Sequence, residues 1–347
     1  MQVISVAEAL SRPSVFVDTR SPAEYEQGHI PGAVNVPLLE NDERAIVGTL
    51  YKQQGPEEAK SKGLDIVSGK LASIVRQISN LNPSPEKRLV VYCWRGGMRS
   101  KSVLTILELM GISGSQLTGG YKAYRRHVQE QLAVYELKSE IVVLCGSTGV
   151  GKTILLQMLA NRGYPVLDLE GLANHRGSAF GHVGIGKPAT AQNFDAQLLG
   201  ELQKMNEKKV ILVECESKRV GNVYLPDVLY QAMQRGRRVL VKAGVPTRVA
   251  RLIAEYTDVL QPNDPEIIAS LHSLTRKLGK RKTARLLEEY EAGNVHVFTA
   301  SLLTDYYDGL YGYEDASPDD FDLIVDAEDF EKAATDIAAY IDRLIRG

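Results

Sequence analysis

The chain has 347 residues, about twice the length of a typical single domain, so we expect two domains that each bury a core. An apolar fraction of 44% and a charged fraction of 24% are ordinary for a globular protein and exclude a disordered or collagen-like chain. The formal net charge of −2 excludes a strongly basic nucleic-acid coat protein, but it leaves room for a local basic patch.

Cysteine content and the distribution of apolar residues predict the compartment. The 3 cysteines are too few for a disulfide framework, and none has the CxxC spacing of a structural zinc site. The N-terminal segment has no basic start followed by an apolar core, and no apolar stretch is long enough to span a membrane. We therefore expect a reduced, cytoplasmic protein without a membrane partner.

Short apolar runs alternate with helical patterns along the chain, which predicts an α/β fold with mostly parallel sheets. The first part has expected strands at 15–17, 33–36, 89–92 and 116–117, and expected helices at 69–79 and 100–110. The second part has expected strands at 141–145, 166–167, 210–213, 239–242 and 323–325, and expected helices at 152–161, 248–256, 265–287 and 329–345. A charged helical bridge at 124–137 gives a first domain over 1–130 and a second over 131–347.

The first chemical signal in chain order is a cysteine at the end of an apolar strand. Cys93 is followed by a glycine-containing loop and the start of a helix, with Arg95 and Arg99 close by. Loop amides and these cations are expected to lower the pKa of the thiol from about 8.5 and to favour the nucleophilic thiolate. Without that loop, Cys93 would be a small buried hydrophobic residue, the interpretation we favour for Cys145 and Cys215.

The second signal is a phosphate-binding loop. Residues 146–153 read GSTGVGKT and satisfy G-x-x-x-x-G-K-[ST] between an apolar run and a helical pattern. The glycines let backbone N–H groups turn towards an anion, Lys152 adds a point charge, and the Thr153 hydroxyl can complete a magnesium shell. The predicted diphosphate- or nucleotide-binding residues are Gly146, Ser147, Thr148, Gly149, Val150, Gly151, Lys152 and Thr153. The motif predicts a polyphosphate ligand without specifying which one.

Two acids follow the apolar strand at 210–213. Glu214 ends the strand and Glu216 comes two residues later, where phosphate-loop folds place the carboxylate that orients magnesium or water. The usual residue there is aspartate, and an acid after an apolar strand is often only a solvated strand end, so both interpretations stay open. No N-K-x-D sequence follows in this half, which disfavours a GTPase.

The first part of the chain resembles the rhodanese sulfurtransferases. The resemblance rests on the loop CWRGGMR at 93–99 and on segments in the same order as in that family, DTR at 18–20, EY at 24–25, GHIPGAVN at 28–35 and LTGGYKAY at 117–124. It covers about residues 1–130. It implies a structural ion pair between Asp18 and Arg20 and a structural role for His29.

A rhodanese domain followed by a phosphate-loop domain resembles the tRNA 2-selenouridine synthases over nearly the whole length. The segments DLEGLANHRGSAFG at 168–181 and VECESKRVG at 213–221 are similar to that family, and the second accounts for Glu214 in place of aspartate. The resemblance implies replacement of sulfur by selenium in the wobble 2-thiouridine of tRNA. Selenophosphate would be the selenium donor, and S-geranyl-2-thiouridine, formed from geranyl diphosphate, the intermediate.

The resemblance assigns a task to each domain. Cys93 would carry selenium as a selenosulfide, while Arg95 and Arg99 hold the anionic donor. The phosphate loop would bind the diphosphate of geranyl diphosphate, with Lys152 and any Mg²⁺, for which Thr153 is the expected ligand, stabilising the leaving charge.

A tRNA substrate requires cationic surface. The segment 276–285 holds the candidate contacts Arg276, Lys280, Arg281 and Lys282, with no acid among them, and Arg235, Arg237 and Arg238 form a second cluster. A solvated helix face is the alternative interpretation. His175, Arg176 and Phe180 are candidates to hold the flipped base or the donor, or else they order a loop.

Two other functions remain open at this point. One is an ATP-dependent kinase or ligase fused to a sulfurtransferase. The other is a redox or nucleotide sensor that turns over no substrate.

Overall fold

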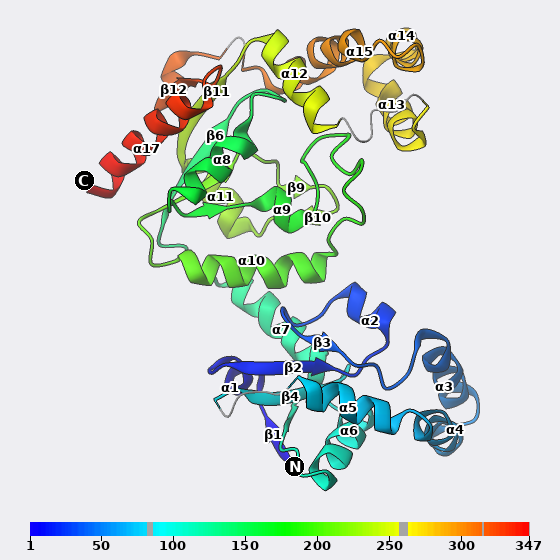
Figure 1. The fold of residues 1–347 in the computed structure, drawn as a ribbon. Helices are drawn as coiled ribbons and strands as arrows, with labels where there is room; N and C mark the ends of the chain where they lie inside the picture. The colour runs from blue at the N-terminus through cyan, green and yellow to red at the C-terminus, as the bar shows by residue number, and fades with distance from the viewer. Residues whose placement is uncertain (82–85, 257–262, 314–315, 347) are drawn as a thin grey trace. The chain divides into compact units, whose positions relative to one another are not determined.

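The computed structural model describes residues 1–81, 86–256, 263–313 and 316–346 (Figure 1). The chain divides into two compact units, one made of Met1–Val134 with Thr190–Leu199 and the other of Tyr135–Ala189 with Gly200–Gly347. Each unit contains a parallel five-stranded sheet among the described residues. The predicted class, two consecutive α/β domains with parallel sheets, is confirmed.

The sheet of the first unit has the strand order β1-β5-β4-β2-β3. Its strands are β1 (Gln2–Ile4), β2 (Ser14–Asp18), β3 (Val34–Asn35), β4 (Arg88–Tyr92) and β5 (Ser115–Leu117). All pairs are parallel, and the central β2 and β4 are apolar on both faces because helices cover both. The predicted strands match β2 to β5, with β3 shorter than expected, while β1 was not predicted.

Several helices belong to the first unit. They are α1 (Val6–Leu10), α2 (Pro22–Gln27), α3 (Asn41–Gln53), α4 (Pro56–Ser68), α5 (Leu71–Asn80), α6 (Met98–Leu109) and α7 (Gly120–Ala133). Val17, Leu89 and Val91 of the sheet pack in one buried cluster with Ile78 of α5 and Leu107 of α6. The bridge helix α7 begins at Gly120, four residues earlier than predicted.

The sheet of the second unit has the order β12-β11-β6-β8-β7, again all parallel. Its strands are β6 (Glu140–Cys145), β7 (Val166–Leu167), β8 (Val210–Glu214), β11 (Arg237–Lys242) and β12 (Leu323–Asp326), as predicted to within two residues. Alternate strand residues such as Val142 and Leu212 form one buried cluster with Leu155 of α8 (Lys152–Asn161) and Ile337 of α17 (Phe330–Arg346). This cluster fixes the position of α8 against the sheet, and therefore the position of the loop that precedes it.

Further elements complete the chain. They are α9 (Leu169–Ala173), α10 (Ala191–Met205), the antiparallel pair β9 (Arg219–Val220) and β10 (Val223–Tyr224), α11 (Asp227–Arg235), α12 (Val245–Glu255), the π-helical turn Leu303–Tyr307, α16 (Asp308–Tyr311) and the short turn Pro318–Asp320. The helices α13 (Pro265–Leu278), α14 (Lys280–Glu291) and α15 (Val295–Leu302) lie together in Figure 1. The single helix expected over 265–287 is wrong: Gly279, with φ +84°, separates α13 from α14.

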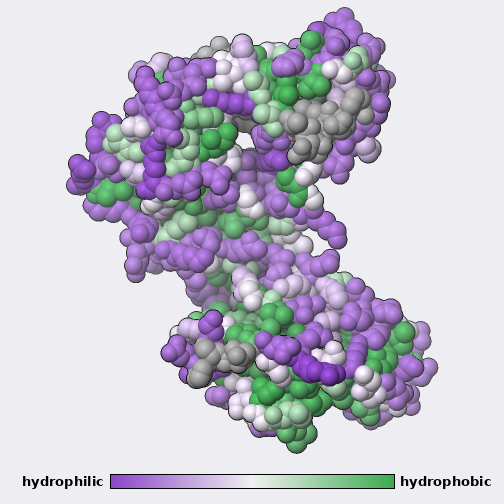
Figure 2. Space-filling model, viewed as in Figure 1, coloured by the Kyte–Doolittle hydropathy of each residue, from purple (hydrophilic) through white to green (hydrophobic). Residues whose placement is uncertain are grey.

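The face of the molecule drawn in Figure 2 is predominantly polar. Hydrophilic residues cover most of the face drawn in Figure 2, including its outer edge over α13 to α15. Among the described residues, the helices are all too short or too polar to cross a membrane.

Candidate active sites

Cys93 follows the C-terminal end of β4 in a tightly folded loop. Its Sγ accepts a hydrogen bond from the Gly97 N–H at 3.2 Å, lies 3.3 Å from Ser100 Oγ, and is part of a side chain only 3% exposed. A Cβ on Gly120 would lie 2.1 Å from the Cys93 carbonyl oxygen, so only glycine fits there. The loop therefore encloses the sulfur with donor groups, as a cradle for a small anion would.

Buried polar contacts hold the base of this loop. Asp18 and Arg20 form an ion pair at 2.6 Å with side chains 0% and 1% exposed, and the Arg20 guanidinium lies 4.0 Å from the ring centre of Tyr121. The structural ion pair implied by the rhodanese resemblance is confirmed. His29 Nδ1 lies 3.0 Å from the carbonyl oxygen of Tyr25, which fits the structural role expected for this histidine.

The two loop arginines have different surroundings. Arg95 is exposed and has no hydrogen bond or ion pair within the described part of the chain. Arg99 binds Glu24 through Nη1–Oε2 at 2.6 Å and Nη2–Oε1 at 3.3 Å. Burial alone would raise the pKa of Glu24, but the hydrogen bonds and charge of Arg99 hold that pKa below its ordinary value. The charge of Arg99 is thus already compensated by a carboxylate.

The phosphate loop joins β6 to α8 in the second unit. Gly149 and Gly151 have φ values of +82° and +93°, which glycine adopts most readily. Lys152 Nζ donates a hydrogen bond to the Gly146 carbonyl oxygen at 3.0 Å. The strand–loop–helix context predicted from the motif is confirmed. No side chain of the described residues caps the first N–H groups of α8, which suits this helix start to binding an anion.

Two arginines of α12, which the sequence analysis did not single out, brace this loop. Arg248 Nε donates to the Thr148 carbonyl at 2.8 Å, and its guanidinium forms a buried ion pair with Asp308 at 2.5 Å. Arg251 Nη1 donates to the Val150 carbonyl at 2.7 Å. The carbonyl groups of Gly146, Thr148 and Val150 therefore have fixed partners, which holds the backbone of the loop in place.

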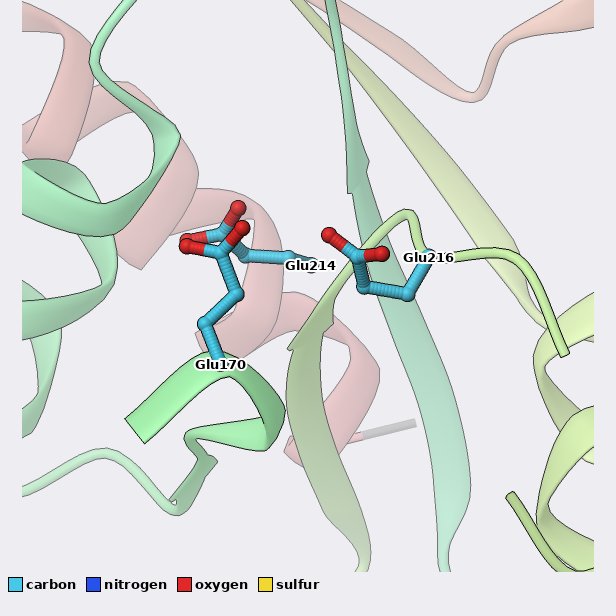
Figure 3. Close-up of side chains that lie close together, drawn as sticks. All are labelled: Glu170, Glu214 and Glu216. Carbon is cyan, nitrogen blue, oxygen red and sulfur yellow. The ribbon is translucent and has the colours of Figure 1, made fainter. Parts of the chain in front are cut away.

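Three carboxylates meet beside the loop (Figure 3). One oxygen each from Glu170, Glu214 and Glu216 all lie within 4.8 Å of one another. Glu214 is 5% exposed, Thr153 hydrogen-bonds to it, and its Oε1 has no hydrogen-bond partner in the described residues. A buried oxygen without a partner is costly, so this arrangement suits a cation.

Burial raises the pKa of all three acids, and repulsion by neighbouring acids adds to the rise. Burial and the charges of Glu214 and Glu216 raise the pKa of Glu170 to about 9. Burial and the charge of Glu214 raise the pKa of Glu216 to about 7. Burial also raises the pKa of Glu214, although Lys152 opposes the rise. Gly177, which has φ +62°, lies against the carboxylates of Glu170 and Glu216. A Cβ at this position would lie 2.5 Å from an oxygen of each, so the absence of a side chain allows the two acids to lie this close to the backbone.

Glu170 was not among the predicted site residues. It lies on α9, directly after β7, and β7 pairs in parallel with β8, which ends at Glu214. Since the carboxyl ends of neighbouring parallel strands meet at one edge of a sheet, an acid shortly after the strand at 166–167 was a usable signal.

A cavity of about 500 Å³ opens beside the phosphate loop. One part of its lining is polar and consists of Lys152, Thr153, Glu170, Glu214 and Glu216, whose three acids lie together. The other part is apolar and consists of Phe180, Leu252, Ile267, Phe298, Leu302 and Tyr307, which belong to or pack against one buried cluster. The cavity thus combines an anion and cation site with a hydrocarbon-like chamber supplied by α12, α13 and α15.

The three candidates at 175–180 take different positions. Arg176 and Phe180 line the cavity, and Arg176 Nε pairs with Glu255 at 2.9 Å. His175 is not part of the lining: its ring packs against Gly181 and Gly221, where a Cβ would come within 2.7 Å. The loop-ordering interpretation therefore fits His175, while the other two residues reach the cavity.

The remaining cysteines also differ from each other. Cys145 is fully buried, as expected, whereas Cys215 lines the cavity. A hydrogen bond from Cys145 lowers the pKa of Cys215 to about 6.

The basic segments expose their cations to different degrees. Arg276, Lys280, Arg281 and Lys282 are all exposed around the break between α13 and α14, and Lys282 pairs with Asp305 at 2.9 Å. In the second cluster, Arg237 pairs with Glu140 and Asp322. The first segment therefore offers more uncompensated positive charge.

Comparisons with known proteins identify both units. Residues 139–340 match the family model "tRNA 2-selenouridine synthase AAA domain", and residues 4–127 match the rhodanese-like domain. The chain is 34% identical to the tRNA 2-selenouridine synthase of Nitrosomonas europaea, covering 84% of this chain and 77% of that protein. It is 36% identical to that of Bordetella bronchiseptica and 33% identical to that of Bdellovibrio bacteriovorus, covering 88% and 87% of those proteins. The chain therefore belongs to the tRNA 2-selenouridine synthase family, whose members are transferases that modify tRNA.

Proposed function

We propose that this protein replaces sulfur by selenium in the wobble 2-thiouridine of tRNA in two steps, one at each candidate site. The phosphate-loop cavity transfers a geranyl group from geranyl diphosphate to the sulfur. The cysteine loop then provides selenium derived from selenophosphate. The observation that carries the proposal is the cavity of about 500 Å³ with one charged and one apolar part in its lining.

The two parts of the lining match the two parts of geranyl diphosphate. A chamber lined by Ile267, Phe298 and Leu302 gains free energy by burying a hydrocarbon chain. In the proposed step, the sulfur of 2-thiouridine attacks C1 of the geranyl chain, and the C1–O bond breaks with its electron pair going to diphosphate. The alkylated sulfur can later leave as a thiol, which makes the base open to attack by selenium.

The loop residues stabilise the departing diphosphate. The N–H groups at the start of α8 and the ammonium group of Lys152 are positioned before the reaction, so they stabilise the developing charge without reorganising. Glu170, Glu214, Glu216 and the Thr153 hydroxyl are hard oxygen ligands of the kind that Mg²⁺ prefers. When bound there, Mg²⁺ would supply positive charge beside the diphosphate.

Cys93 is the proposed residue that acts on selenophosphate. The P–Se bond breaks with its electron pair going to selenium while water takes the phosphoryl group, and the hydroselenide released attacks C2 of the base and expels geranylthiol. The sulfur of Cys93 accepts a hydrogen bond from the Gly97 N–H, and Arg95 is available to attract the anionic selenophosphate. Arg99, which we expected to share this task, is paired with Glu24 and is assigned here to ordering the loop.

The segment around Gly279 is the proposed tRNA contact. Replacing Lys280 and Arg281 together by alanine should weaken tRNA binding and lower the slope of log affinity against log salt by roughly 2, since each phosphate contact contributes about 1. The control removes Lys52 and Lys62, which are exposed on α3 and α4 and carry the same total charge. A salt slope unchanged by the first pair, or lowered equally by both pairs, would contradict this contact.

Nucleoside mass spectrometry tests the whole proposal. Thiolated tRNA is incubated with the protein, Mg²⁺, selenophosphate and geranyl diphosphate, and each component is omitted in turn. We expect S-geranyl-2-thiouridine when only selenophosphate is missing and 2-selenouridine with the complete mixture. Turnover of ATP with no change in the nucleoside would favour the kinase or ligase, and no turnover of any kind would favour the sensor.

A further inference from the structure

We infer, building on the proposed geranyl transfer, that the ring of Phe298 closes the apolar part of the cavity and limits the prenyl chain to the geranyl length. Phe298 lies on α15 and is only 3% exposed, yet it lines the cavity together with Ile267 and Leu302. It is therefore a wall residue whose side chain belongs to the core of the helical layer.

A second aromatic ring packs against Phe298 on the side away from the cavity. Tyr290 of α14 is 1% exposed and does not line the cavity, and its ring centre lies 5.4 Å from that of Phe298. Its hydroxyl accepts a hydrogen bond from the Asp264 N–H at 3.1 Å, which holds the ring in place. Phe298 thus separates the cavity from an apolar surface that is already formed.

The residues that pack behind the neighbouring wall residue Tyr307 are more polar than those behind Phe298. The Tyr307 ring packs at 4.9 Å against Tyr306, whose hydroxyl lies 3.5 Å from Lys277 Nζ. Removing Tyr307 would open the chamber towards Tyr306, whose hydroxyl group and Lys277 partner are a poor environment for hydrocarbon. The direction behind Phe298 is therefore the one in which a longer prenyl chain gains apolar contact.

The size of the ring sets the expected selectivity. A benzyl side chain occupies about the space of one isoprene unit, the amount by which farnesyl exceeds geranyl. In a packed chamber, an added hydrocarbon group changes relative specificity by roughly 10- to 200-fold. The wild-type protein should therefore prefer geranyl diphosphate over farnesyl diphosphate by about tenfold or more.

The test compares kcat/KM for geranyl and farnesyl diphosphate with thiolated tRNA, using nucleoside mass spectrometry. Phe298→Ala should raise the farnesyl-to-geranyl ratio by about tenfold or more. Phe298→Leu removes less volume, perturbs folding less and should raise the ratio by a smaller factor. The control is Leu286→Ala, a buried residue of the same core that does not line the cavity and should leave the ratio unchanged.

The outcomes separate the inference from the function on which it rests. If both Phe298 variants are folded by circular dichroism and still transfer geranyl with the wild-type ratio, Phe298 does not limit chain length, although the proposed function stands. If the Leu286→Ala variant shifts the ratio as much as Phe298→Ala, general loosening of the core explains the effect and the inference is wrong. If the wild-type protein transfers neither prenyl group to tRNA, the proposed function itself fails.

Discussion

The cysteine loop and the phosphate-loop cavity differ in how the charges of their side chains are balanced. Around Cys93, the charges of Arg20 and Arg99 are compensated by Asp18 and Glu24, and the sulfur already has donors. Beside the phosphate loop, three acids crowd together, and a buried oxygen of Glu214 has no partner in the described residues. The charges of the first site are therefore balanced within the protein. The second site needs a cation and a diphosphate to balance its charges.

The largest effect that tests this difference between the two sites is expected for cation binding by the three acids. Glu214→Gln removes the buried carboxylate and should weaken Mn²⁺ or Mg²⁺ binding by roughly 10- to 100-fold, measured by calorimetric titration of the protein without diphosphate. The matched control is Glu207→Gln, which changes an exposed acid of the same unit. Unchanged cation affinity in Glu214→Gln would show that the three acids are not a metal site.

Gly177 tests whether the close approach of the acids matters. Gly177→Ala places a Cβ 2.5 Å from oxygens of Glu170 and Glu216, so we expect roughly tenfold weaker cation binding. Gly186→Ala is the control, since Gly186 has φ +78° but a Cβ there meets nothing within 4 Å. Both variants should lose about 1 kcal/mol of stability through backbone strain, but only the first should bind the cation more weakly. Equal cation affinity in the two variants would contradict the account.

The pH dependence of stability should have opposite signs in the two units. The pKa of Glu24 is lowered, so its pair with Arg99 stabilises the folded state at neutral pH, and this is lost as pH falls below about 4. Glu24→Gln should therefore cost about 1 kcal/mol at pH 7 and nothing in acid. Trp94, which is the single tryptophan, lies in the first unit, so its fluorescence can follow this unfolding transition.

The acids of the second unit should behave in the reverse way. The pKa of Glu170 is raised to about 9, so its stabilising protonated form is fully present below about pH 4.5 and is lost as pH rises through 9. In metal-free protein, Glu170→Gln should have no effect below about pH 4.5 and should raise the free energy of unfolding progressively as the pH rises from there towards 9. Calorimetry in the presence of a chelator measures this. A stabilising effect that is independent of pH would show that Glu170 does not hold a proton.

Local sequence patterns predicted the parts of each site that are contiguous in the chain. The phosphate loop follows from glycine spacing and a strand–helix context, and Cys93 follows from its place after an apolar strand. Contacts between distant segments were not predictable in the same way. Arg99 meets Glu24 across 75 positions, and Glu170 joins Glu214 only because β7 and β8 are neighbours.

The apolar chamber was also absent from the sequence-based predictions. Its lining residues from α12, α13 and α15 have ordinary core spacing, and nothing in their pattern separates a cavity wall from a packed core. The break at Gly279 was missed because the apolar periodicity continues on both sides of the glycine, although its positive φ ends α13.

The division of labour between the two sites is tested most directly by comparing Cys93→Ser with Lys152→Ala in one nucleoside assay with both donors present. Cys93→Ser should accumulate S-geranyl-2-thiouridine and form no 2-selenouridine. Lys152→Ala should lose geranylation by roughly 100-fold or more, because it removes a preorganised charge at the leaving diphosphate. Loss of both reactions in Cys93→Ser, or full geranylation in Lys152→Ala, would contradict the assignment of the two steps to the two sites.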